Sequence, residues 1–249
     1  MLKRIDFFIL LARLFLGYIF ISSGLCKMTL GHFGQLIGPP QLETELVKHG
    51  LGPFWGMIGI TQVICGLLIF SQPFSTLGAI MLLPMNICIT GLTISMGWQG
   101  TPYVNGAITA LNLIVLFYDW HKLKFLFAIY QFHDLRTTML DKLNINSLNI
   151  SALVSGAVAM ATAQFNYQLT AVFGILCFSL ICLSIIKSRL CNKLQITILI
   201  LATANMIMIT LSFGPSSMAM KLTIANSLVL LILYIVSLFM PAPRLGGSK

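Results

Sequence analysis

Eight apolar stretches, most of them close to the length that a helix needs to cross a bilayer, dominate this sequence. A membrane-spanning helix requires roughly 20 apolar residues. The stretches lie at residues 7–27, 53–72, 75–97, 103–121, 147–166, 170–187, 190–212 and 222–240. Charged residues make up only 8% of the chain, whereas a soluble domain carries about 25%. We therefore predict an all-α, polytopic integral membrane protein with about eight transmembrane helices, covered by the lipid bilayer.

The Lys and Arg residues are distributed unevenly between the two sides that these spans define. Cytoplasmic segments of multispan proteins carry an excess of Lys and Arg. Eleven of the 15 lie on the side of both termini, at positions 3, 4, 122, 124, 136, 142, 187, 189, 193, 244 and 249. Only Lys27, Lys48 and Lys221 lie on the other side. We predict cytoplasmic N- and C-termini in a bacterial inner (plasma) membrane. Cations between apolar runs, and not along one face, do not indicate nucleic-acid binding despite the net charge of +9.

The first span carries a regular pattern of charged and small residues. Arg13, Gly17, Phe20, Gly24 and Lys27 follow one another at steps of four and three, so they share one helix face. Gly17 and Gly24 would let another helix approach that face closely. Arg13 lies six residues from the inner end of the predicted span, roughly 9 Å deep. A charge at this depth normally faces the bundle interior and has a partner.

The fourth span offers that partner. Asn105, Asn112 and Asp119 recur at seven-residue intervals, and Asp119 lies near the same end of the bundle as Arg13. An Arg13–Asp119 ion pair would hold spans one and four together. Alternatively, Asp119 lies among the lipid head groups while the Arg13 side chain extends towards the inner surface. Thr101 and Pro102 are typical of an N-cap and a first helical position, so they predict where this span begins.

Spans two and three each carry one amide at mid-membrane depth. Gln62 lies on a face with Gly59 and Gly66, and Asn86 follows Pro84. These amides could line a polar pocket, or form interhelical hydrogen bonds worth about 1 kcal/mol each. The predicted intramembrane polar cluster, a candidate ligand site, consists of Arg13, Lys27, Gln62, Asn86, Asn105, Asn112 and Asp119. The sequence indicates no catalytic residue and no metal site, because the four His residues are divided between the two sides.

The remaining segments predict surface helices and a simpler second half. Residues 40–49 are typical of a short helix on the outer surface. A basic amphipathic segment at 123–146 suits the inner interface and divides a four-span bundle at 1–122 from a four-span region at 147–249. In that second region small residues on span five predict close packing, and Asn205 could bond Asn226.

The first half resembles the DoxX family of small four-helix membrane proteins. The resemblance rests on five segments in a specific order: RLFLGYIF at 13–20, SGLCKM at 23–28, GLGP at 50–53, GITQVICG at 59–66 and NLIVLFYDW at 112–120. The family is linked to thiosulfate:quinone oxidoreductase subunits and to membrane partners of redox enzymes, so the resemblance implies a quinone as a possible cofactor. Members commonly carry a carboxylate where this chain has Gln62, and an amide cannot transfer protons in its place.

Two functions are compatible with these features. The first is a non-catalytic accessory or scaffold subunit of a quinone-linked membrane redox system, with a redox enzyme as its membrane partner. The alternative is a transporter or channel for a small solute or lipid, using the polar face of spans one to four. The sequence shows no matched pair of broken helices, which would point to a transporter site. A stand-alone enzyme is not expected, because no nucleophile or cofactor motif is present.

Overall fold

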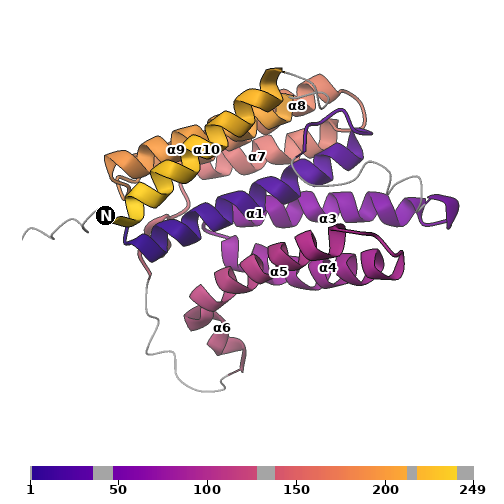
Figure 1. Cartoon of the computed structure of the whole chain (residues 1–249), viewed down its shortest axis with the longest axis horizontal. Helices are drawn as coiled ribbons and strands as arrows, with labels where there is room; N and C mark the ends of the chain where they lie inside the picture. The colour runs from indigo at the N-terminus through magenta and orange to yellow at the C-terminus, as the bar shows by residue number, and fades with distance from the viewer. Residues whose placement is uncertain (1, 36–46, 128–137, 212–217, 240–249) are drawn as a thin grey trace, which may run out of the picture.

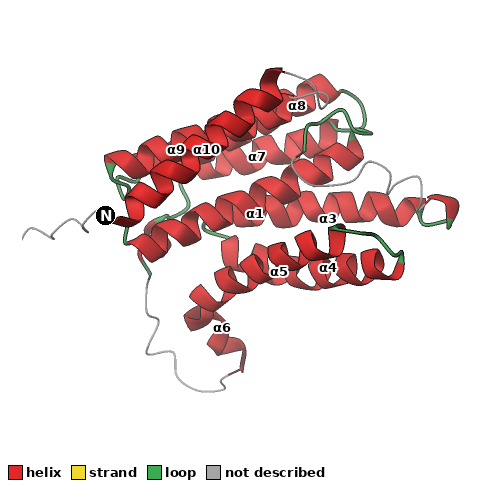
Figure 2. Cartoon of the chain, viewed as in Figure 1, coloured by secondary structure: helices red, strands yellow, loops and turns green. Residues whose placement is uncertain are grey.

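The computed structural model describes residues 2–35, 47–127, 138–211 and 218–239, and these residues form helices and no β-strand (Figures 1 and 2). The all-α prediction is therefore confirmed. The helices of the first half are α1 (Arg4–Met28), α3 (Gly52–Phe70), α4 (Ser75–Ser95), α5 (Thr101–Tyr118) and α6 (Trp120–Phe127). Those of the second half are the 3₁₀ helix η1 (Met139–Lys142), α7 (Ser147–Thr162), α8 (Tyr167–Lys187), α9 (Lys193–Leu211) and α10 (Met218–Phe239).

Each of the eight predicted apolar stretches forms a helix. Seven of these helices are long and apolar enough to cross a bilayer, as expected for a multi-pass membrane protein. The eighth, α7, is apolar but has only 16 residues, so it is about 24 Å long. The prediction carried this helix to residue 166. It ends earlier because the Asn166 side chain caps α8, accepting hydrogen bonds from the N–H groups of Gln168 and Leu169.

Helix α1 lies at the centre of the molecule, with α3, α4 and α5 on one side and α7 to α10 on the other (Figure 1). Leu14 and Tyr18 belong to the apolar core that α1 shares with α3, α7, α8 and α9, whereas Leu16 and Ile19 belong to a second core shared with α3, α4 and α5. Of its most apolar 18-residue window, 78% is buried, against 6% for α10. A helix that is apolar on all sides is suited to this central position.

Helices α1 and α3 approach closely because glycines face each other across their interface. A Cβ atom on Gly24 would lie 2.5 Å from the carbonyl oxygen of Gly59, and one on Gly66 would lie 2.8 Å from the backbone nitrogen of Ile21. A Cβ atom on Gly17 would lie 2.7 Å from that of Phe70. The predicted close-packing role of Gly17 and Gly24 is therefore confirmed.

The second half is held by short polar contacts between neighbouring helices. The Asn226 amide donates to Asn205 Oδ1 over 2.9 Å, which confirms the predicted Asn205–Asn226 bond, and Asn205 donates to Ser227 Oγ. On α7, Ser155 donates to the carbonyl oxygen of Phe173, and Ala152 is fully buried, as the small-residue face predicted. These contacts join α9 to α10 and α7 to α8.

Two predicted surface segments are described only in part. Helix α6 overlaps the start of the predicted basic connector 123–146, and η1 lies within it. Residues 128–137 between them lie outside the described residues. η1 begins with a capping box in which Thr138 and Asp141 bond each other's backbone and side chains. Most of the predicted outer helix at 40–49 also lies outside the described residues.

Candidate functional site

Arg13 and Asp119 form a buried ion pair between α1 and the C-terminal end of α5. One guanidinium nitrogen, Nη2, lies 2.9 Å from Asp119 Oδ1 and 2.7 Å from Oδ2. Both side chains are almost fully excluded from the surface, with exposures of 1% and 0%. The predicted pair is therefore confirmed, and Asp119 is enclosed by protein. Because a lone charge is very costly at this depth, each residue depends on the other.

Further polar groups complete this end of the bundle. Thr76, the second residue of α4, donates its hydroxyl to Asp119 Oδ2 over 2.8 Å. Lys122 lies 3.5 Å from Asp119 Oδ1 and also pairs with Asp141 of η1. Tyr118 donates to Asp6 of α1 over 2.6 Å. The Arg13–Asp119 pair is thus the centre of a network that joins α1, α4, α5 and the start of the connector.

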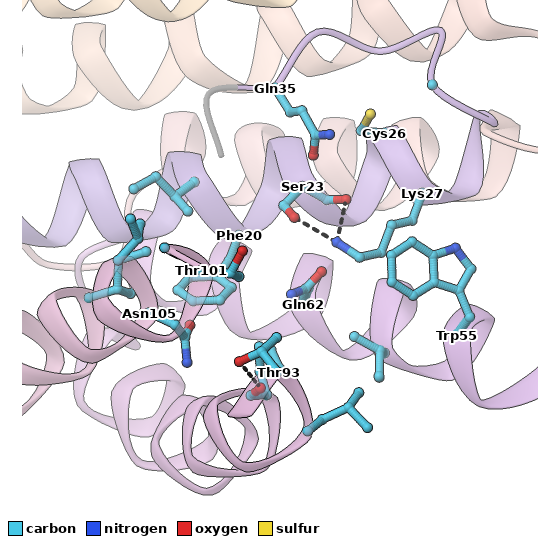
Figure 3. A pocket seen from close by; sticks show the side chains of 18 of the residues that line it. Phe20, Ser23, Cys26, Lys27, Gln35, Trp55, Gln62, Thr93, Thr101 and Asn105 are labelled. Atoms are coloured by element: carbon cyan, nitrogen blue, oxygen red, sulfur yellow. Dashed lines mark hydrogen bonds between the residues drawn. The ribbon is translucent and has the colours of Figure 1, made fainter. Parts of the chain in front are cut away.

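A cavity of about 410 Å³ lies among α1, α3, α4 and α5, near the C-terminal ends of α1 and α4 and the start of α5. Figure 3 shows the side chains that line it. We call this cavity the Lys27 pocket. Its polar lining comes from α1, α3, α4, α5 and the loops beside them, and comprises Ser23, Lys27, Gln35, Trp55, Gln62, Thr93, Gln99, Thr101 and Asn105. Its apolar lining includes Ile19, Phe20, Ile58, Ile89, Leu92 and Ile108.

Lys27 is the charged group of this pocket. Its ammonium donates to Ser23 Oγ over 2.7 Å and to the Ser23 carbonyl oxygen over 3.2 Å. It also lies 4.9 Å from the centre of the Trp55 ring, a cation–π contact. Both interactions hold the ammonium beside the cavity (Figure 3). Neither supplies a negative charge.

Two buried side chains of the pocket carry atoms without a hydrogen-bond partner. The indole nitrogen of Trp55 has none, although the residue is only 7% exposed. The amide oxygen of Gln62 has none either, at 4% exposure. Buried polar groups are normally bonded. Unused donors and acceptors on a cavity wall are therefore what a binding site for a polar group requires.

The first turn of α5 also borders the pocket, and it is not capped as the sequence predicted. Thr101 was expected to be the N-cap, but the N-cap is Gly100, whose φ of +91° suits glycine. No side chain of the described residues caps this turn. Gly100 and Thr101 both line the cavity. The N-terminus of α5, with its partial positive charge, therefore lies at the pocket.

The structure divides the predicted polar cluster between these two sites. Lys27, Gln62 and Asn105 line the pocket, whereas Arg13 and Asp119 form the ion pair. The Asn105 amide bonds the Asn86 carbonyl oxygen and the Thr90 hydroxyl. Gln62 therefore lies with Lys27 at the pocket and not with Arg13 at the ion pair.

Two amides lie in the interior without joining either site. Asn112 donates to the Ala79 carbonyl oxygen over 3.1 Å, and its own side-chain oxygen has no partner. Asn86 is fully buried and both of its side-chain polar atoms lack partners. On α4, Asn86 lies between Thr76 of the ion-pair network and Thr93 of the pocket. On α5, Asn112 lies between Asn105 of the pocket and Asp119 of the ion pair.

Several residues of the two sites carried no recognisable signal in the sequence. Trp55, Thr93 and Ser23 are single polar or aromatic residues in apolar runs, and Thr76 lies at a helix start. Only the position of neighbouring helices shows what they contact. The described residues contain no group of three or more His, Cys, Asp or Glu side chains that could hold a metal ion.

The apolar helices and the two buried polar sites define a polytopic helical membrane protein. Residues 8–96 match the DoxX family model, which confirms the resemblance to the DoxX family over this region. The match covers α1, α3 and α4, about a third of the chain, and ends before α5. Asn105, Asn112 and Asp119 therefore lie beyond the matched region. Comparisons with curated proteins and with solved structures returned no match.

Proposed function

We propose that this protein is a non-catalytic accessory or scaffold subunit of a quinone-linked membrane redox system, and that the Lys27 pocket holds the head group of a membrane-soluble ligand. The supporting observation is the pocket itself. Ligand pockets are commonly 300–1,000 Å³, mostly apolar, with a few well-placed polar groups. The cavity of about 410 Å³, with Lys27, Trp55 and Gln62 on an apolar wall, has these properties.

The pocket residues are compatible with a quinone head group. Quinone carbonyl oxygens are hydrogen-bond acceptors, and the Lys27 ammonium and the Trp55 indole N–H are donors at the cavity wall. Phe20 and Ile19 supply apolar surface for a ring. A bound quinone would supply the electron chemistry, and the chain would bind and orient it. The Gln62 amide does not ionise near neutral pH and so cannot act as an acid or base, which supports a binding role over a catalytic one.

The ion pair supports the scaffold part of this proposal. Arg13 and Asp119 are bonded to each other, Asp119 also accepts a hydrogen bond from Thr76, and both charged side chains are inaccessible to a ligand. Their arrangement is suited to holding α1, α4 and α5 in fixed positions around the pocket. The two sites would then have different tasks, one structural and one in ligand binding.

One observation favours the transporter or channel alternative. Asn86 and Asn112 carry unpartnered polar atoms in the interior of the four helices, and such groups can line a pathway. The buried Arg13–Asp119 pair joins α1 to α5 at one end of these helices, so a pathway running between them would have to pass it. Transport would require this pair to open in each cycle.

Gentle purification of the full-length protein tests the proposal. We expect a redox enzyme to co-purify, or quinone to be present in the lipid extract. The amount of quinone should be lower for Lys27→Met and unchanged for Lys221→Met on α10, the matched control. Recovery of the protein alone and free of quinone, together with solute uptake into liposomes that Asn86→Leu abolishes, would overturn the proposal in favour of transport.

A further inference from the structure

We infer that the Lys27 pocket selects a ligand whose head group is an anion, a phosphate or a carboxylate, carried on an apolar chain. This inference rests on the proposed function, since it requires the pocket to be a ligand site. It departs from the proposed quinone in one respect, because the head group it requires carries a negative charge and a quinone does not. The steps are the charge of the pocket, its unused donors and the shape of its apolar wall.

The pocket has an excess of positive charge. Lys27 is the charged side chain among the described residues that line it. Its ammonium bonds neutral oxygens of Ser23 and lies over Trp55, and no carboxylate of the described residues pairs with it. A cation held beside a largely apolar cavity is destabilised unless it is paired. A negatively charged head group would provide the counter-charge.

The hydrogen-bonding groups around the cavity also suit an anion. The Trp55 indole nitrogen can only donate, is 7% exposed and has no partner. The uncapped N-terminus of α5, at Gly100 and Thr101, adds backbone N–H groups and a partial positive charge. The Gln62 amide can donate through its nitrogen, but its unpartnered buried atom is the oxygen, which is an acceptor, so the case for an anion depends on Lys27, Trp55 and the start of α5. Three helices therefore direct donors or positive charge at one cavity.

The apolar wall indicates that the anion carries a chain. Ile89, Leu92 and Ile108 from α4 and α5 line the cavity. Val104 also lines it and is 44% exposed, so this wall reaches a surface of α5 that would face lipid. A chain attached to a head group at Lys27 can leave along this wall. An anionic lipid-like molecule matches this arrangement better than a free ion does.

Binding of defined probes to the full-length protein in a neutral detergent tests the inference. The probes are dioctanoyl phosphatidic acid, dioctanoyl phosphatidylcholine, inorganic phosphate and a short-chain quinone, measured by calorimetry. We expect phosphatidic acid to bind about 10- to 100-fold more tightly than phosphatidylcholine, as a charged hydrogen bond is worth. Inorganic phosphate should bind weakly, because it gains nothing from the apolar wall.

Four variants separate charge from packing. Lys27→Met should remove the preference for phosphatidic acid, and Lys27→Arg should retain it. Gln62→Glu should abolish phosphatidic acid binding, because the new carboxylate would neutralise Lys27 and repel the phosphate. Lys221→Met, which removes a cation of α10, should change nothing. Thermal unfolding of each variant establishes that it is folded before binding is compared.

Other outcomes would overturn the inference. Equal affinity for the two lipids, or a preference that survives in Lys27→Met, would do so. Phosphate binding as tight as that of phosphatidic acid would rule out the apolar chain. Glu43 and Glu45 follow Lys27 in the sequence. If an anion binds only after both are replaced, in Glu43→Gln, Glu45→Gln, then a carboxylate of the chain already provides the counter-charge for Lys27. Quinone binding that is independent of Lys27 would overturn the inference of an anionic ligand and leave the proposed function standing. If no probe binds, the ligand-binding part of the proposed function fails as well.

Discussion

The two halves of this protein differ in how they treat buried polar groups. Among residues 138–211 and 221–238, whose side chains the structure describes, every buried side-chain nitrogen and oxygen has a hydrogen-bond partner. In the first half, unpartnered buried atoms occur on Arg13, Trp55, Gln62, Gln72, Asn86 and Asn112. A region with all of its polar groups paired is organised for packing. A region with spare donors and acceptors around a cavity retains the capacity to bind, and this contrast can be tested by substitution.

The largest effect is expected at the Arg13–Asp119 ion pair of the first half. Asp119→Asn would leave Arg13 charged and buried without its counter-charge, and breaking a buried pair costs about 3–5 kcal/mol. We expect a large loss of folded protein, measured by size-exclusion yield and thermal unfolding. The double variant Arg13→Met, Asp119→Leu should recover much of the loss. If Asp119→Asn is as stable as the wild type, the pair does not hold the first half together.

A smaller effect is expected where the two central helices touch. Gly24→Ala would place a Cβ atom 2.5 Å from the Gly59 carbonyl oxygen, and overpacking of this kind costs about 1–3 kcal/mol. Gly106→Ala on α5 is the matched control, because nothing lies within 4 Å of its Cβ position. Thermal unfolding should separate the two variants. Equal midpoints would show that α1 and α3 separate at little cost.

The contrast between the halves is sharpest for two asparagines. Asn226→Leu would lose bonds to Asn205 and to the Leu201 carbonyl oxygen, at about 1 kcal/mol. Asn86→Leu would lose no side-chain bond and should be neutral or slightly stabilising. Denaturation midpoints compare them directly. A loss at Asn86 as large as that at Asn226 would mean that Asn86 has a partner in the membrane, and the contrast would fail.

The smallest effect concerns Asp141, outside the spans. Burial raises the pKa of its carboxyl, but hydrogen bonds from Lys122 and Thr138 outweigh this and hold the pKa below its ordinary value of 3.8. The carboxylate therefore adds stability above about pH 3.8, and this contribution is lost as the pH falls through the lowered pKa. Asp141→Asn should unfold at a lower temperature than the wild type at pH 7, and the difference should shrink progressively as the pH falls below about 3.8. A constant difference would exclude this ionisation as the cause.

The contacts that the sequence predicted are those governed by helix periodicity. Arg13 and Asp119 could be paired because α1 and α5 run in opposite directions, so two charges near one membrane surface meet. Asn205 and Asn226 follow the same logic across α9 and α10. Gly17 and Gly24 share a face at a seven-residue interval, which is sufficient to predict close approach.

The pocket could not be predicted in the same way. It depends on how α3 and α4 are rotated about their axes, and an apolar helix with few polar residues carries little information on this. Trp55 and Thr93 therefore gave no signal, and the polar residues were grouped as one cluster when they occupy two ends. The start of α5 was misplaced by one residue because Gly100 can adopt a positive φ, which Thr101 would avoid.

The central position of α1 has a consequence for biosynthesis. Arg13 precedes its counter-ion by 106 residues, and at ribosomal speeds that separation corresponds to on the order of 10 s. The first helix to be made therefore carries an unpaired guanidinium until α5 is inserted. Its other face remains without packing partners for longer, until α8 and α9 are made. A nascent chain of this kind would depend on the insertion machinery or a chaperone to shelter its first segment, and chains stalled before Asp119 should be early targets for membrane proteolysis.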